Sequence, residues 1–270
     1  MKARIAVLSV AILAVAAATL SAHDMFIKLD RYFVAPGDTL VVPILNGTFT
    51  TSENGIEWER VSKLEVLDST GVAHPGPRRW TITDAKRTEF EYVPLAEGTY
   101  VIGVSTLPRE LSMTATAFNA YLKEEGITDI LARRKKLGQM DVPSRERYSK
   151  NVKAVFQVGE RRSPSVATPL GFGAEIVPLD NPYAPQRSGR LRFQCLVDGK
   201  PVGGMTVLVG NQQGNAKPKE SALVTDGEGI VSVKLTRSGK WYVKFVRMVP
   251  VTGGDVTYES KWATITFGVR

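Results

Sequence analysis

The sequence has few of the residues on which common catalytic sites depend. It contains one cysteine, Cys195, so no intrachain disulfide can form. That cysteine lies in an apolar run, 191–197, which predicts a buried, unreactive thiol. Its two histidines are His23 and His74, and the chain lacks a Gly-x-Ser-x-Gly motif. Because no nucleophile has an evident orienting base, we expect the protein not to be an enzyme.

Long apolar runs are absent beyond residue 22, so no transmembrane helix is predicted there. Residues 1–22 have the layout of a secretory signal peptide, with a basic head, an apolar run over 5–18 and small residues at the end. The expected cut follows Ala22, although Ala16-Ala17-Ala18 offers a second small-x-small site. A periplasmic or secreted protein is predicted.

Acidic residues are fewer than basic ones, and the formal charge is +8. Loss of Lys2 and Arg4 with the leader lowers the charge from +8 to +6. The positive residues are scattered apart from Arg133-Arg134-Lys135-Lys136. A scattered excess favours solubility over nucleic-acid binding, so no nucleic-acid partner is expected.

Short strands separated by turns are predicted on both sides of a helical segment. The first set lies at 26–33, 39–45, 61–67, 88–93 and 98–104, with the last two forming a hairpin, and a further strand at 151–158. Helical spacing of apolar residues predicts two amphipathic helices, 117–125 and 128–137. The second set lies at 191–197, 205–209, 221–225, 230–235, 241–246 and 262–269.

Residues 168–185 hold four prolines and two glycines, which is typical of an extended connector. The predicted fold is therefore mainly β, with two antiparallel β-sandwich domains of immunoglobulin or transthyretin type. The N-terminal domain covers 23–167 with a helical insertion at 117–138. A connector follows at 168–188, and the smaller C-terminal domain covers 189–270.

His23 is the leading candidate metal ligand. A cut after Ala22 would give one metal ion both its ring nitrogen and the free α-amino nitrogen, a donor set that suits copper, nickel or zinc. His74, in a predicted turn, could supply a third ligand, and Asp24 an auxiliary one. The alternative is that His23 is simply a terminal residue and His74 an exposed loop residue. Ligands at a chain end would bind an ion weakly, which suits delivery rather than catalysis.

Several stretches resemble a family of exported bacterial proteins that are named for nickel-transport components or left as domains of unknown function. The matching stretches are Ala22-His23-Asp24 with Pro36-Gly37-Asp38, 118–126, Arg147-Tyr148-Ser149-Lys150, 175–183 and 258–264. This resemblance implies two β-sandwich-like domains and an extracytoplasmic role, sometimes in the uptake of nickel or cobalt. This chain has Arg247-Met248 where members often carry a histidine.

Together these features predict an extracytoplasmic, non-catalytic binding protein. Its ligand would be a nickel, cobalt or copper ion held by His23, His74 and Asp24, and its partner a membrane transport complex that takes up the ion. The alternative function is that of a secreted adhesive or scaffolding module that binds protein or polysaccharide and no metal.

Overall fold

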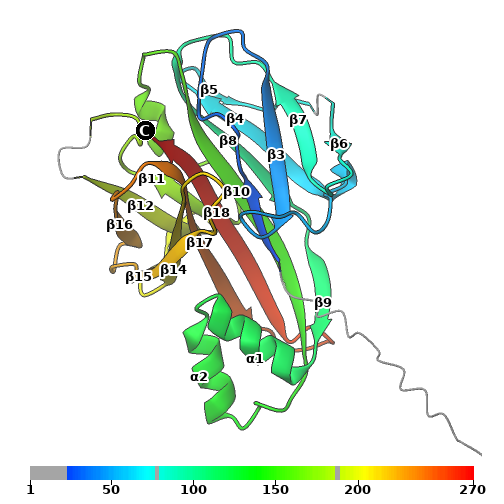
Figure 1. Ribbon diagram of the computed structural model, residues 1–270. Helices are drawn as coiled ribbons and strands as arrows, with labels where there is room; N and C mark the ends of the chain where they lie inside the picture. The colour runs from blue at the N-terminus through cyan, green and yellow to red at the C-terminus, as the bar shows by residue number, and fades with distance from the viewer. Residues whose placement is uncertain (1–22, 77–78, 186–188) are drawn as a thin grey trace, which may run out of the picture.

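The computed structural model describes residues 23–76, 79–185 and 189–270. The predicted signal peptide lies outside these ranges. A large, twisted central sheet dominates the fold, and its longest strands run the length of the molecule (Figure 1). Its main path is β15 (Lys219–Val224), β14 (Thr206–Gln212), β17 (Gly239–Pro250), β18 (Tyr258–Val269), β10 (Ser144–Val158), β8 (Gly98–Thr106), β4 (Val61–Asp68) and β5 (Gly71–Ala73). Two short strands, β2 (Phe33–Val34) and β9 (Arg109–Met113), also pair with β10.

Two smaller sheets pack against the central one. The first consists of β1 (Asp24–Ile27), β3 (Leu40–Gly47), β7 (Thr88–Tyr92) and β6 (Thr81–Ile82). The second consists of β11 (Ala174–Pro178), β12 (Arg190–Val197), β13 (Lys200–Pro201) and β16 (Ile230–Lys234). The fold is therefore mainly β with sandwich-like layers, as predicted.

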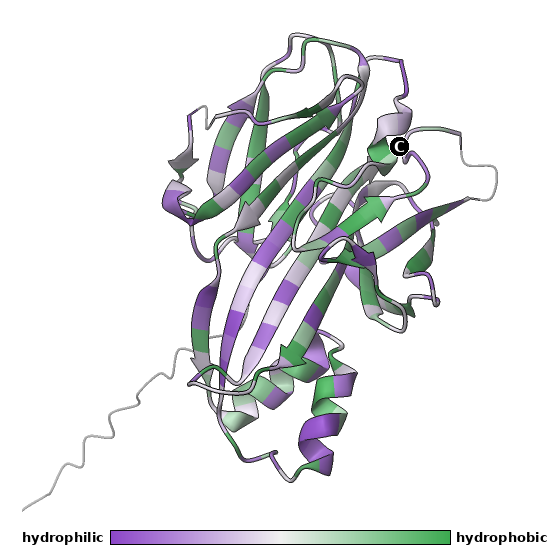
Figure 2. Ribbon diagram, turned by 180° about the vertical axis from the view of Figure 1, so that it is seen from behind, coloured by the Kyte–Doolittle hydropathy of each residue, from purple (hydrophilic) through white to green (hydrophobic). Residues whose placement is uncertain are grey.

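The two small sheets cover opposite faces of the central sheet. Ala154 and Phe156 of β10 pack with the first small sheet, whereas Val155 between them packs with the second. Because successive side chains of a strand point to opposite faces, the two cores lie on either side of β10. Figure 2 shows bands of polar and apolar residues along the strands.

The two helices predicted at 117–125 and 128–137 are present in the structure. α1 (Ala115–Glu124) and α2 (Thr128–Lys136) lie at one end of the central sheet (Figure 1). The Thr114 hydroxyl caps α1 by accepting a hydrogen bond from the Ala117 amide, 3.3 Å away. The apolar helix face, including Phe118 and Leu122, packs against the ends of β17 and β18.

One predicted pairing is wrong. The strands expected at 88–93 and 98–104 are present, but they do not form a hairpin with each other. β7 pairs with β3 and β6, whereas β8 pairs with β4 and β10. The intervening segment crosses from one layer of the sandwich to the other, and strand patterns do not reveal such a crossover.

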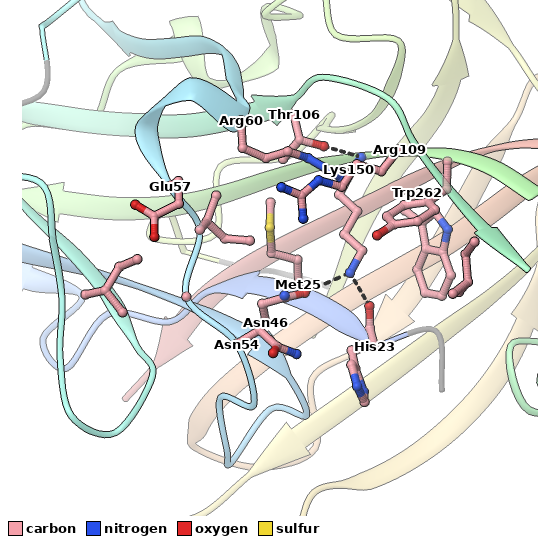
Figure 3. Close-up of a pocket in the computed structure, with 15 residues that line it drawn as sticks. His23, Met25, Asn46, Asn54, Glu57, Arg60, Thr106, Arg109, Lys150 and Trp262 are labelled. Carbon is pink, nitrogen blue, oxygen red and sulfur yellow. Dashed lines mark hydrogen bonds between the residues drawn. The ribbon is translucent and has the colours of Figure 1, made fainter. Parts of the chain in front are cut away.

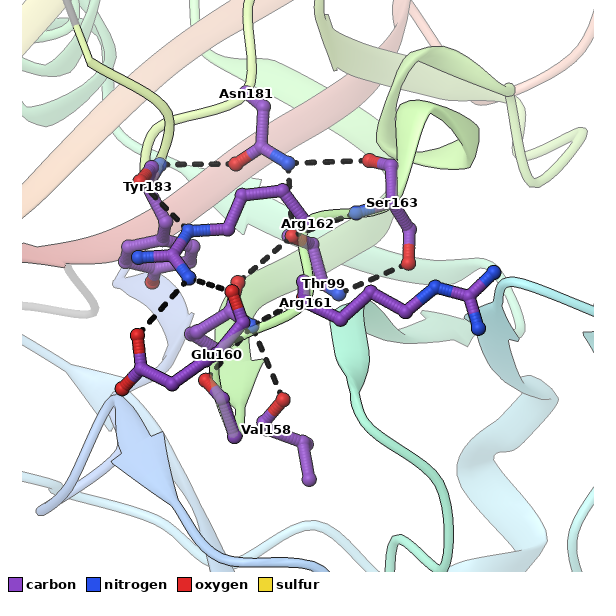
Figure 4. Close-up of polar contacts among 10 residues, drawn as sticks. Thr99, Val158, Glu160, Arg161, Arg162, Ser163, Asn181 and Tyr183 are labelled. Carbon is purple, nitrogen blue, oxygen red and sulfur yellow. Dashed lines mark hydrogen bonds and ion pairs between the residues drawn. The ribbon is translucent and has the colours of Figure 1, made fainter.

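The predicted connector, 168–188, is only partly irregular. It contains β11, all of whose residues are buried, and it follows the short helix η2 (Pro164–Ala167). Asn181 holds the segment to β8, since its amide donates to Thr99 Oγ1 at 2.8 Å and to the Ser163 carbonyl at 3.1 Å (Figure 4). The segment is thus part of the packed structure, while the division into two domains stays a prediction.

Cys195 is fully buried, as predicted. Burial raises the pKa of its thiol to about 12, which keeps the thiolate scarce and the side chain unreactive.

Candidate functional site

A cavity of about 490 Å³ lies where β1 meets the central sheet. Its walls come from segments far apart in the chain: the start of β1, the loop after β3, the short helix η1 (Trp58–Arg60), β9, β10 and β18 (Figure 3). The volume lies within the usual range of small-molecule sites.

Lys150 of β10 projects into this cavity (Figure 3). Its ammonium group donates hydrogen bonds to the His23 carbonyl oxygen and, at 2.8 Å, to Asn46 Oδ1. It also lies over two aromatic rings, 5.5 Å from the centroid of Tyr148 and 5.7 Å from that of Trp262. Burial lowers the pKa of Lys150 to about 8. The cavity thus holds a strongly desolvated ammonium group.

Arg60, the last residue of η1, is a second cation in the wall. Only 8% of the residue is exposed, and its guanidinium lies 5.5 Å from the ring centroid of Tyr148. Its Nε and Nη1 atoms are buried and have no hydrogen-bond partner among the described residues. Burial lowers the pKa of Arg60; Tyr148, which also forms a side-chain hydrogen bond with it, opposes this shift, and the positive charge of Arg109 adds to it.

The remaining walls combine apolar and uncharged polar groups. Met25, Ile56, Ile82 and Leu111 supply apolar surface. Asn46 and Asn54 supply amides, and Glu57 is a carboxylate in the lining. The lining is therefore amphipathic, because it combines cationic, uncharged polar and apolar side chains.

His23 lines the same cavity, next to the Lys150 ammonium group that binds its carbonyl. Its Nε2 lies 3.0 Å from Oε2 of Glu53, a residue of the loop after β3. The side chain keeps 23% of its exposure, so the ring is accessible from solvent. The first described residue is thus built into a cavity wall.

Asp24 is directed elsewhere. Its carboxylate lies 2.6 Å from Lys244 Nζ of β17, and the same ammonium lies 3.0 Å from Glu125 Oε2 after α1. Burial raises the pKa of Asp24, although Lys244 opposes this rise. Asp24 serves as a partner of Lys244 in a buried cluster, and it is not a residue of the cavity wall.

His74 lies after β5, with its side chain 74% exposed and its Nδ1 paired with Glu65 Oε2 of β4. His23 and His74 therefore have different carboxylate partners. In the part of the chain that the structure describes, no three His, Cys, Asp or Glu side chains gather to hold a metal ion. The α-amino ligand proposed for His23 depends on cleavage in the segment outside the described residues.

Three cavity residues were missed in the sequence: Arg60, Arg109 and Lys150. One signal was available for Lys150, which precedes Val152, Ala154 and Phe156 at two-residue spacing. A lysine in phase with three core residues faces the interior, where an uncompensated ammonium group is costly. Nothing comparable in the sequence marks Arg60 or Arg109.

Residues 20–248 match the family described as domain of unknown function DUF4198. The chain belongs to this family. No curated protein matches the chain significantly. The nickel or cobalt association suggested by the sequence resemblance receives no support from these comparisons.

Among solved structures, the chain shows low-identity similarity to the following three. The D0–D1 domain of intimin is 10% identical, covers 91% of this chain and 98% of its own, and gives a TM-score of 0.22. Trypsin-activated alpha-2-macroglobulin from Escherichia coli is 12% identical, with 92% and 16% covered and a TM-score of 0.25. A tetra-tandem repeat of a large adhesion protein is 11% identical, with 92% and 50% covered and a TM-score of 0.24. Scores this low carry no functional argument.

None of the helices in the described ranges combines the length and the apolar character that a membrane crossing requires.

Proposed function

We propose that this DUF4198 protein is an extracytoplasmic, non-catalytic binding protein whose ligand occupies the cavity beside β1. The observation that carries this proposal is the construction of the cavity. Segments around residues 23, 57, 109, 150 and 262 converge on one space of about 490 Å³, and a buried ammonium and a buried guanidinium face it. Such desolvated groups are costly to a fold unless a ligand uses them.

The charge of the lining indicates the sign of the ligand's charge. Arg60, Arg109 and Lys150 outnumber the one carboxylate, Glu57. A bare divalent cation entering this space would be repelled by three positive groups, so the cavity suits a ligand of the opposite sign. Extracytoplasmic location rests on the predicted signal peptide.

A transition-metal ion bound by His23 is the second candidate. The observation that favours it is the accessible imidazole, whose Nε2 lies 3.0 Å from a Glu53 oxygen. With the α-amino nitrogen of a chain cut after Ala22, three donors of suitable type would be available. Delivery of the ion to a membrane uptake system would then be the biological role.

Binding in the cavity is tested with an occluding variant. The secreted protein is screened by thermal shift against metal ions, organic anions, amino acids and neutral sugars, and hits are measured by calorimetry. Asn54→Trp places an indole at the mouth of the cavity, whereas Ser69→Trp places one on an exposed turn outside it. We expect at least one ligand that stabilises wild type and Ser69→Trp but loses at least tenfold in affinity with Asn54→Trp. A ligand unaffected by Asn54→Trp, or a screen without any hit, would refute the proposal.

The metal candidate has its own test. Intact mass establishes the first residue of the secreted protein, and nickel and copper are then titrated into wild type, His23→Ala and His74→Ala. Chelation through His23 predicts that His23→Ala loses at least tenfold in affinity while His74→Ala changes little. Equal affinities in wild type and His23→Ala would exclude this ligand set.

A further inference from the structure

The arginine and lysine cations of the cavity lining form no ion pair in the part of the chain that the structure describes, although the negative charges of Asp24, Glu146 and Glu125 act on Lys150 from a greater distance. Within the described residues, none of Arg60, Arg109 and Lys150 has a carboxylate oxygen within ion-pair distance. Glu57 is the one carboxylate of the lining, and it forms no ion pair with them. Counting Arg60, Arg109 and Lys150 against Glu57, the arginine, lysine and carboxylate groups of the lining leave an excess of two positive charges.

Arg60 is a cation of the lining whose nitrogen atoms are only partly satisfied by hydrogen bonds. Guanidinium remains charged at any physiological pH and carries five N–H donors. In Arg60, two of its three nitrogen atoms are buried without an acceptor, and the residue is 8% exposed. Its ring partner, Tyr148, contributes a cation–π contact and a side-chain hydrogen bond, but no carboxylate of the described residues forms an ion pair with the guanidinium. The positive charge of Arg60 is therefore left without a counter-charge in direct contact.

Lys150 is a second cation of the cavity whose charge is not neutralised by a contacting carboxylate. Its ammonium group has three N–H donors, and two neutral oxygens accept from it, the His23 carbonyl and Asn46 Oδ1. Two fixed acceptors orient the group without neutralising it. Figure 3 shows Lys150 and Arg60 directed into the same space, with Arg109 beside them.

The size and the apolar lining residues of the cavity restrict the kind of anion that fits. An inorganic ion would fill only a small part of about 490 Å³. The lining also has apolar surface, which a small hydrated inorganic ion would not contact favourably; it comes from Met25, Ile56, Ile82 and Leu111. The ligand must therefore have an organic body as well as negative charge.

We propose that the cavity binds an organic dianion, a small molecule with two carboxylates or one phosphate monoester, whose charged oxygens contact Arg60, Arg109 and Lys150. Two negative charges match the excess of the lining, and planar guanidinium groups bind carboxylate and phosphate oxygens in pairs. This inference rests on the proposed function, in which the cavity is the ligand site.

Four small molecules of similar size test whether the charge of the ligand, rather than its shape, determines its affinity. Succinate and glycerol 3-phosphate represent the two sources of a dianion, butyrate is the matching monoanion and succinamide the matching neutral compound. Calorimetry at low salt is expected to show at least one dianion binding tenfold or more tightly than butyrate, with no measurable binding of succinamide. The dianion that binds identifies the source, and its affinity should fall as the salt concentration rises.

Variants locate the site. Arg60→Met retains the length of the side chain but removes its charge, and it should weaken dianion binding at least tenfold. Arg147→Met removes an exposed arginine that pairs with Glu110 outside the cavity, and it should change affinity less than twofold. Thermal unfolding of both variants verifies that they are folded.

The outcomes distinguish this inference from the proposed function. Equal affinities for succinate and butyrate, or binding that Arg60→Met leaves unchanged, would overturn the dianion assignment. If neither dianion binds while a metal ion or neutral compound binds in a manner sensitive to Asn54→Trp, the dianion assignment fails and the cavity remains the ligand site. If nothing in the broad screen depends on Asn54→Trp, both fail.

Discussion

Lys153 and Glu175 form an ion pair in the interior of the protein. The lysine Nζ lies 2.8 Å from the glutamate Oε1, and each side chain keeps 2% of its exposure. Glu175 also accepts hydrogen bonds from the backbone amides of Leu170, Gly171 and Phe172. The pair joins β10 of the central sheet to β11, the strand within the predicted connector.

Breaking this pair from one side is expected to be strongly destabilising. Glu175→Gln leaves the buried Lys153 ammonium without a counter-charge, and we expect a loss of about 3–5 kcal/mol in the free energy of unfolding. Asp198→Asn breaks the exposed Lys261–Asp198 pair and should cost about 0–1 kcal/mol. Urea unfolding measures both, and equal losses would contradict the prediction.

Arg60→Met should not destabilise the unliganded protein. The substitution replaces a buried guanidinium, two of whose nitrogen atoms lack acceptors, with an apolar chain of similar length. We expect unchanged stability or a gain of about 1 kcal/mol, the pattern of a residue kept for binding rather than for folding. A loss above about 2 kcal/mol in urea unfolding would instead assign Arg60 a structural role.

The cluster around Lys244 predicts a pH dependence. Burial raises the pKa of Glu125 to about 8. The folded state therefore holds this proton more tightly than the unfolded state, so the contribution of Glu125 to stability falls as the pH rises from about 4.5 to about 8.

Glu125→Gln removes that titration. Wild type should lose stability relative to the variant between pH 5 and pH 8, by at most about 1.4 kcal/mol per pH unit for one proton. Urea unfolding at several pH values measures the difference. Parallel curves for the two proteins would show that Glu125 is ionised in the folded state.

Gly210 of β14 leaves room for the ring of Tyr242, the residue of β17 that is paired with it. A Cβ at this position would lie 2.1 Å from Tyr242 Cζ. Gly210→Ala should therefore displace the Tyr242 side chain, whose ring lies 4.6 Å from that of Phe49 between centroids and whose hydroxyl donates to Glu220 Oε1 at 2.9 Å. We expect a loss of about 1–3 kcal/mol.

Gly227→Ala is the matched control for this substitution, because nothing lies within 4 Å of its added Cβ. Its stability in urea unfolding should stay close to wild type. If the two alanine variants are equally stable, the Tyr242 ring accommodates the methyl group without cost.

Local patterns in the sequence predicted the elements better than their arrangement. Helical spacing located α1 and α2 within two residues at each end, and alternation located most strands, because both signals come from neighbouring residues. The pairing of β7 was predicted wrongly because the choice between two sheets depends on packing over long sequence distances.

The same limit applies to the candidate site. His23 stood out because the predicted cleavage gives it special chemistry, and the structure places it in a cavity wall. Its predicted companions, His74 and Asp24, pair instead with Glu65 and Lys244. Arg60 and Arg109 are ordinary surface residues by sequence, and only the convergence of η1 and β9 on β10 places them at the same cavity.

The place of β18 constrains the order in which the molecule is assembled. This last strand lies between β10, with which it is parallel, and β17. Glu146 is opposite Tyr258, so their pairing waits for more than a hundred further residues to be synthesised. Until then the edge of β10 that β18 will occupy is open to any other extended chain. A nascent molecule halted before β18 is synthesised would thus expose a long, unpaired strand edge, and chaperones that shield such edges should be most needed at that stage.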